Sequence, residues 1–205
     1  MTIVLIAIIA GIICLDQVTK WLAVVFLQGE ASFPLWREVL HFTYAENTGM
    51  AFGMLKDHRW VFMVFSTLAI IALAVYLFRY RPEGRWMQIS MAFIIGGGIG
   101  NMIDRIFLGY VVDFIDFTLI DFAIFNVADS FVCVGAGIMI VLLFIDLVKE
   151  IKLERAQKAA VTAGAKVEET AKAEAEEKTE TKAEEKTETE APAQPRSQAG
   201  TQRSN

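Results

Sequence analysis

Several aspartates of this sequence lie in or beside apolar segments, where a charged group is poorly solvated. Asp113 lies between Val112 and Phe114, and apolar surroundings raise the pKa of a carboxyl group. A second carboxylate nearby raises the pKa of one member of the pair further. Two such groups can share a proton, so that one acts as a base on water and the other as an acid. Spacing alone leaves several candidates for this pair, namely Asp104, Asp113, Asp116, Asp121 and Asp129.

Three clusters of polar residues interrupt or border the apolar runs of the chain. Asp16 and Lys20 are four residues apart, so they share one face of a helix. A charge at the centre of a bilayer costs roughly 2.5 to 3.5 kcal/mol on insertion scales, so such groups are expected to have partners or a function. The second and third clusters comprise Asn101, Asp104 and Arg105, and Asn126 and Asp129.

Each cluster also has a purely structural interpretation. Asp16 and Lys20 can form an ion pair that holds their helix at the membrane interface. The second cluster can anchor its helix to lipid headgroups, and the glycines before it permit close helix packing. Asn126 is a good helix N-cap, and an acid three residues later suits the first turn. If only the neighbouring residues are considered, this position in the first turn of a helix is enough to explain Asp129.

The apolar runs themselves are long enough to cross a membrane. Hydrophobic residues make up 55% of the chain, and a transmembrane helix needs roughly 20 mainly apolar residues. The first run has no basic segment before it and no Ala-x-Ala site after it, so we interpret it as a span and not as a cleaved signal peptide. The predicted spans are residues 3–27, 60–78, 87–103 and 127–148.

Basic residues predict the orientation of these spans. Arg79, Arg81 and Arg85 lie in the link between the second and third spans, and further basic residues follow the fourth. The positive-inside rule places both regions in the cytoplasm, together with both termini. Residues 28–59 and 105–126 then face outward. The three polar clusters are therefore expected to lie together at the outer ends of their helices.

The outer segment 28–59 predicts a small folded platform. Partial alternation over residues 39–44 indicates a short strand, and residues 47–49 indicate a turn. Aromatic residues in this segment favour the lipid headgroup region. We expect an all-α polytopic membrane protein with four transmembrane helices in residues 1–153 and a small extracytoplasmic β/loop platform.

The remaining residues, 154–205, have a different composition. From residue 156 onward there is no Ile, Leu, Phe, Tyr or Trp, and residues 175–182 are repeated almost unchanged as 183–190. Such a tail has no apolar burial to offset the entropy of ordering, so we predict a disordered cytoplasmic tail.

Composition also disfavours several function classes. The sequence has no basic stripe outside the helix flanks, so nucleic-acid binding has no support. Cys14 and Cys133 both lie within apolar runs, and His41 and His58 are isolated. We therefore predict neither a disulfide nor a metal site.

The motifs taken together resemble those of the bacterial lipoprotein signal peptidases (signal peptidase II), which are membrane-embedded aspartyl proteases. The resemblance covers residues 1–150 and implies that Asp113 and Asp129 form the catalytic dyad, which activates a water for attack on the scissile carbonyl. It implies no metal or organic cofactor. The matching segments, in order, are Asp16-Gln-Val-Thr-Lys20, Asn47-Thr-Gly49-Met-Ala-Phe52, Gly97 through Asn101-Met-Ile-Asp104-Arg105, Val111-Val-Asp113-Phe-Ile-Asp116-Phe117 and Phe125-Asn126-Val-Ala128-Asp129-Ser130.

The resemblance further implies the substrate and the surroundings of the site. The substrate class is a prolipoprotein whose signal peptide precedes a cysteine bearing a diacylglyceryl group, and cleavage falls just before that cysteine. The protein is then expected in the bacterial cytoplasmic (inner) membrane, in contact with lipids, with its active site on the extracytoplasmic face. We expect the aromatic loop, with Trp36 and Phe52, to clamp the substrate. The supporting residues implied are Asp16, Lys20, Asn47, Gly49, Asn101, Asp104, Arg105, Asn126 and Ala128.

Some positions depart from the family's pattern. Met50 stands where the family often has Ala, and Glu46 stands where a basic residue is common. Both changes bear on substrate fit and not on the dyad. Residues 118–124 form a short segment without the Trp and Pro often found there, so its geometry stays open.

A small ion- or proton-coupled transporter is the competing interpretation, with the intramembrane charges as a relay. Two features oppose it: the polar clusters gather at one surface and not at the midplane, and the two halves show no inverted repeat. A non-enzymatic anchoring subunit would explain the helices but would leave Asp113 without a role.

Overall fold

A computed structural model describes residues 1–49, 59–120 and 122–189 of the chain. Within these residues, four helices are long and apolar enough to cross a membrane, which confirms the predicted spans. Their spanning parts are Thr2–Leu27, Met63–Tyr80, Arg85–Phe107 and Val127–Lys158. The complete elements are α1 (Thr2–Leu27), α2 (Arg59–Val75) with its π-helical continuation η2 (Tyr76–Tyr80), α3 (Arg85–Phe107) and α4 (Val127–Thr189).

Small residues let α3 pack closely against both α1 and α2. A Cβ atom at Gly96 would lie 3.0 Å from Ile12 of α1, and one at Gly98 would lie 2.9 Å from Ile70 of α2. Because lipid tails are as apolar as the helix surfaces, such close approach and its van der Waals contacts drive helix association in a membrane. The interpretation of this glycine run as a packing surface is confirmed.

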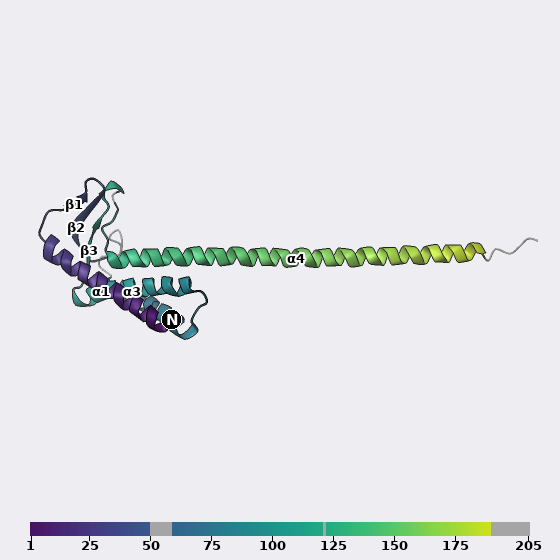
Figure 1. Ribbon diagram of the computed structural model, residues 1–205, viewed down its shortest axis with the longest axis horizontal. Coiled ribbons are helices and arrows are strands. Elements are labelled where there is room, and N and C mark those ends of the chain that lie inside the picture. The colour runs from purple at the N-terminus through teal and green to yellow at the C-terminus, as the bar shows by residue number, and fades with distance from the viewer. Residues whose placement is uncertain (50–58, 121, 190–205) are drawn as a thin grey trace, which may run out of the picture. The chain divides into compact units, whose positions relative to one another are not determined.

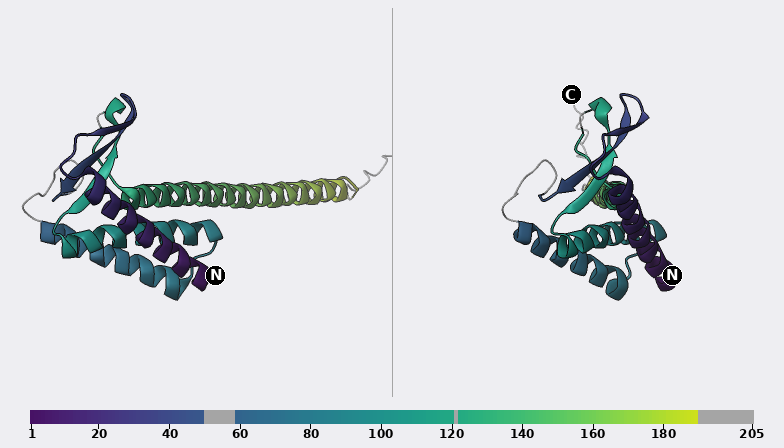
Figure 2. Two further views of the ribbon diagram at one scale, coloured as in Figure 1. Left: turned by 60° about the vertical axis from the view of Figure 1, so that its left-hand side comes forward. Right: turned by 90° about the vertical axis from the view of Figure 1, so that its left-hand side faces the viewer.

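The remaining regular structure is a three-stranded antiparallel sheet with the strands in chain order. Figures 1 and 2 show it at the end of α1 that lies away from the N-terminus. The strand predicted over residues 39–44 is confirmed, although it runs further, to Asn47. The strands are β1 (Phe33–Trp36), β2 (Leu40–Asn47) and β3 (Val111–Asp116), and the short 3-10 helix η3 (Thr118–Ile120) follows β3.

One face of the sheet packs on the C-terminal part of α1. Val112 and Phe114 of β3 form a buried cluster with Ala23 of α1. Because side chains alternate along a strand, Asp113 points to the other face, toward the ends of α3 and α4. The sheet therefore holds a carboxylate over the helix ends.

The last helix continues beyond its membrane span, into the segment 154–205 for which disorder is predicted. Its backbone is helical to Thr189, and the chain divides into the compact units Met1–Asp146 and Leu147–Asn205. The composition explains the helix, because Ala, Glu and Lys are strong helix formers and residues 165–189 contain neither Gly nor Pro. Residues 190–205 lie outside the described residues, and so does that part of the prediction.

Candidate active site

A buried lysine joins the C-terminal parts of α1 and α3. The Nζ atom of Lys20 lies 2.9 Å from Oδ2 of Asp16 and 3.0 Å from Oδ2 of Asp104, and it donates to Oδ1 of Asn101 at 2.9 Å. The predicted ion pair of Asp16 and Lys20 is therefore confirmed. The headgroup interpretation of Asp104 is wrong, because Asp104 is only 3% exposed and pairs with Lys20. The two polar clusters of α1 and α3 thus form one network.

The third cluster joins this network at the start of α4. Asn126 Oδ1 accepts the backbone N–H of Asp129 at 2.9 Å, and Asp129 Oδ2 accepts the backbone N–H of Asn126 at 3.4 Å. This reciprocal pattern is a capping box, so the predicted N-cap is confirmed. Asp16 Oδ1 accepts the N–H of Ala128 at 3.0 Å, which ties α1 to the same helix end.

Two glycines of α3 make room for this meeting of helices. A Cβ atom at Gly97 would collide with the carbonyl oxygen of Ala128, and one at Gly100 would lie 2.5 Å from Oδ2 of Asp16. Any side chain at these positions would therefore push α3 away from Asp16 and from the first turn of α4.

Asp113 reaches the same place from the sheet and is only 2% exposed. Its Oδ1 accepts from Nδ2 of Asn126 at 2.7 Å, and its Oδ2 accepts from Nδ2 of Asn47 at 3.0 Å. Asn47 ends β2, in which Ala45 is the direct partner of Asp113. The other side-chain atom of Asn47, Oδ1, accepts the N–H of Gly49 at 3.0 Å, so this turn orients the amide toward Asp113.

Asp129 is half-buried at the first turn of α4 and shares a neighbour with Asp113. Its Oδ1 accepts from Nδ2 of Asn101 at 2.7 Å, while Oδ1 of Asn101 accepts from Lys20 and from Asn126. Asn126 therefore bonds to one carboxylate through its side chain and to the other through its backbone. The two aspartates lie on either side of one asparagine.

The surroundings of Asp113 raise its pKa. Burial raises the pKa of Asp113 to about 6, and the negative charge of Asp129 contributes to the rise. The amides of Asn47 and Asn126 and the charge of Lys20 act in the opposite direction, since they stabilise the ionised form. A carboxyl that titrates near neutral pH beside a second carboxylate is able to carry the shared proton of an acid–base pair.

A second cation lies near the carboxylates. Arg105, in the last turn of α3, interacts electrostatically with Asp129, Asp113 and Asp104. Its guanidinium donates to the carbonyl oxygen of Asn101 at 3.3 Å. Arg105 thus partly balances the negative charge that two carboxylates bring to one site.

Two of the other candidate aspartates have separate partners. Asp116, at the far end of β3, accepts from the hydroxyl of Thr43 at 2.8 Å and belongs to a separate group on the sheet. Asp104 has its charge partner in Lys20. Asp121 lies outside the described residues, as do Met50 and Phe52 of the predicted loop.

All of the predicted supporting residues take part in the network that contains Asp113 and Asp129. Gln17 was not predicted, yet it donates to Oδ1 of Asp104 at 2.9 Å and to the carbonyl oxygen of Gly100 at 3.2 Å. The available signal was its place between Asp16 and Lys20, as an uncharged amide in an apolar run.

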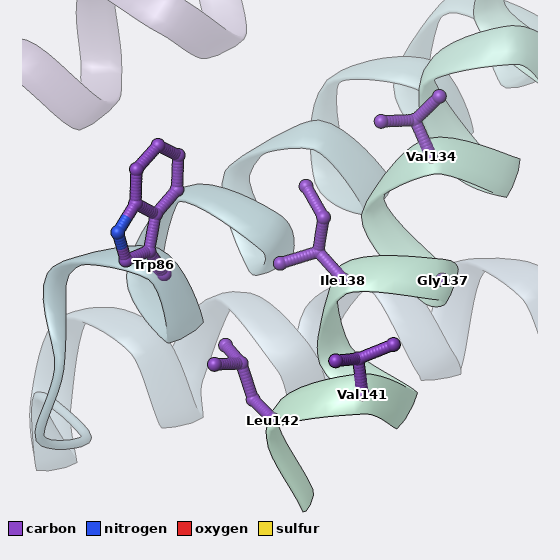
Figure 3. Close-up of a pocket in the computed structure, with 6 residues that line it drawn as sticks. All are labelled: Trp86, Val134, Gly137, Ile138, Val141 and Leu142. Atoms are coloured by element: carbon purple, nitrogen blue, oxygen red, sulfur yellow. The ribbon is translucent and has the colours of Figure 1, made fainter. Parts of the chain in front are cut away.

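An apolar groove between α3 and α4 has no groups for catalysis (Figure 3). It measures about 460 Å³, and its lining carries no carboxyl, imidazole or hydroxyl group. At about 100° per residue, Ile138 lies on the opposite side of α4 from Asp129. This groove is therefore separate from the carboxylates. It is lined by Trp86, Val134, Gly137, Ile138, Val141 and Leu142.

The fold and the site define a polytopic membrane protein with an acid–base network at the ends of its spanning helices. The family described as "Signal peptidase (SPase) II" matches residues 8–145. A lipoprotein signal peptidase of Brevibacillus brevis is 42% identical over 137 residues, which cover 67% of this chain and 92% of that protein. One of Caldanaerobacter subterraneus subsp. tengcongensis is 47% identical over 134 residues, with 65% and 91% covered.

A solved structure agrees with these sequence relatives. A bacterial membrane enzyme determined by the in meso method at 2.3 Å resolution matches with a TM-score of 0.64 and 32% identity, covering 70% of this chain and 89% of that one. The chain belongs to the signal peptidase II family. The transporter interpretation is therefore set aside.

Proposed function

We propose that Asp113 and Asp129 are the catalytic dyad of this protein and act together on one water molecule. As a member of the signal peptidase II family, the chain is an aspartic endopeptidase of the bacterial inner membrane that removes signal peptides from lipoprotein precursors. The observation that carries the dyad is the pair of hydrogen bonds through which Asn126 holds both carboxylates.

The pKa of Asp113 supports a division of labour between the two groups. With its pKa raised to about 6 by burial, Asp113 holds a proton more readily than an exposed aspartate. Ionised Asp129 takes a proton from water, whose oxygen attacks the scissile carbonyl carbon. Asp113 gives its proton to the carbonyl oxygen, which yields a gem-diol. Asp129 then protonates the amide nitrogen, the C–N bond breaks, and Asp113 recovers a proton from the gem-diol.

The substrate we propose is a prolipoprotein whose cysteine bears a diacylglyceryl group. The network lies at the ends of α1, α3 and α4, so the scissile bond would be cut at the level of the headgroups while the acyl chains stay in the hydrocarbon. The sheet beside the network exposes large apolar side chains, as expected at a lipid interface. These are Phe33, Leu35 and Trp36 of β1 and Leu119 and Ile120 of η3.

The orientation that fits this chemistry has both termini in the cytoplasm and the dyad on the extracytoplasmic face. It follows from the arginines at positions 79, 81 and 85, which lie at the opposite end of α3 from Asp104. A lipidated precursor then reaches the dyad laterally from the outer leaflet. We propose that the platform, with Trp36 of β1, clamps the precursor there.

Reconstitution with a defined substrate tests the dyad. Purified protein in lipid would be given a precursor peptide with and without the diacylglyceryl group. Wild type should cleave only the lipidated peptide, just before the cysteine. Asp113→Asn and Asp129→Asn should each lose at least about a thousandfold in rate, in line with the loss of an acid–base group.

Asp116→Asn is the matched control, because Asp116 lies on the same strand but bonds to Thr43 instead of the network. It should process the substrate like wild type. Retention of full activity by either dyad variant would refute the assignment of the dyad.

A further inference from the structure

The amide of Gln17 is placed where three acceptors converge. Its Nε2 lies 2.9 Å from Oδ1 of Asp104, 3.2 Å from the carbonyl oxygen of Gly100 and 3.2 Å from Oδ2 of Asp16. Since all three neighbours are acceptors, they orient the amide with its NH₂ group toward them. A carbonyl oxygen in that place would face only other oxygens.

The strongest of these contacts completes the environment of a buried carboxylate. Oδ2 of Asp104 accepts from Nζ of Lys20 at 3.0 Å and from the backbone N–H of Val112 at 3.1 Å. Oδ1 receives its donor from Gln17. Each oxygen of Asp104 therefore has a partner, and the carboxylate plane is held at both ends.

This orientation matters because Val112 directly precedes Asp113 in β3. The bond from Val112 to Asp104 pins the strand to α3 one residue before Asp113. A carboxylate that rotated to find a new donor for Oδ1 would move Oδ2 away from Val112. An error of about 1 Å at the reacting groups can lower a rate a hundredfold.

A second route leads from the same carboxylate to Asp129. Lys20 is shared between Asp104 and Oδ1 of Asn101, and Nδ2 of Asn101 donates to Asp129 at 2.7 Å. A shift of Asp104 would therefore also disturb the amide that holds the second carboxylate.

We propose that Gln17 is a positioning residue. It fixes the orientation of Asp104, and Asp104 in turn keeps the carboxyl groups of Asp113 and Asp129 in their positions. The inference rests on the proposed dyad. Gln17 donates to neither Asp113 nor Asp129, so its effect passes through its acceptors, of which Asp104 is the closest.

The test compares Gln17→Met with Thr19→Val in the full-length protein in lipid. Met keeps the length of the side chain and removes the donor. Thr19 is a polar residue of the same helix, and within the described part of the chain its hydroxyl bonds only to the carbonyls of Leu15 and Asp16 in that helix. Gln17→Met should lower kcat about 10- to 100-fold, in line with a misplacement of up to about 1 Å at the reacting groups, with KM within about twofold. Thr19→Val should leave both constants unchanged.

A double-mutant cycle with Asp104→Asn separates positioning from helix packing. If Gln17 acts through Asp104, adding Gln17→Met to Asp104→Asn should lower kcat by less than about twofold more. Additive losses in the cycle, or wild-type kcat in Gln17→Met, would overturn the inference. Asp113→Asn, assayed in parallel, tests the dyad separately. Full activity in that variant would refute the proposed function. An inactive Asp113→Asn together with a fully active Gln17→Met would refute only the role of Gln17.

Discussion

The hydrogen bond from Asn47 to Asp113 should set the pH at which the enzyme loses activity. Nδ2 of Asn47 lies 3.0 Å from Oδ2 of Asp113, and this bond lowers the pKa of a carboxyl that burial has raised to about 6. Replacement by leucine keeps the branched shape of the side chain and removes the donor. The ionised form of Asp113 then loses one of its stabilising partners, so the pKa should rise further.

The size of the shift follows from the strength of such bonds. A hydrogen bond to a charged group contributes about 1.5 to 3 kcal/mol, which corresponds to about 1 to 2 pH units. In the proposed mechanism Asp113 must be protonated, so kcat/KM of wild type should fall as the pH rises through about 6. In Asn47→Leu this alkaline limb should move to about pH 7 or above, because protonated Asp113 persists to higher pH.

The assay is the pH dependence of kcat/KM, which reports the ionisations of the free enzyme. Thr43→Val is the control, because Thr43 lies on the same strand but donates to Asp116 instead of Asp113. Its alkaline limb should coincide with that of wild type. An Asn47→Leu limb that stays in place or moves to lower pH would refute the reasoning about Asp113.

Two further predictions concern the platform and the helix contact. Trp36→Ala should raise KM several-fold with little change in thermal unfolding, because this indole is 68% exposed on the platform. Trp86, which is 65% exposed in the apolar groove, is the control, and Trp86→Ala should leave KM unchanged. Equal KM values in the two variants would count against the clamp. Gly97→Ala should lower stability by about 1 to 3 kcal/mol, since its Cβ would meet the carbonyl of Ala128, and thermal unfolding in detergent measures this. Gly137→Ala, with open space around its Cβ, is the control and should unfold at the same temperature as wild type. A Gly97→Ala variant that also unfolds at the wild-type temperature would show that α3 does not need this close approach.

Features that depend on neighbouring residues could be predicted from the sequence. The membrane spans follow from the length of the apolar runs, because a helix rises by a constant amount per residue. The ion pair of Asp16 and Lys20 follows from helical spacing, and the capping box at Asn126 follows from the residue types at a helix start. The helix of the Ala-, Glu- and Lys-rich segment that ends at Thr189 has a composition with few apolar side chains to bury, so only local propensity supports it.

The sequence by itself determined four spans, a platform and a short set of aspartates, whereas only the tertiary structure decided which of those aspartates share a hydrogen-bond partner. Asp104 pairs with Lys20, and Asp116 accepts a hydrogen bond from Thr43. Asp113 and Asp129 are both hydrogen-bonded to Asn126. Gln17 acquires its acceptors only when Gly100 lets α3 approach α1. Spacing along a chain specifies geometry within one helix or strand, while contacts between segments far apart in sequence depend on how their surfaces pack.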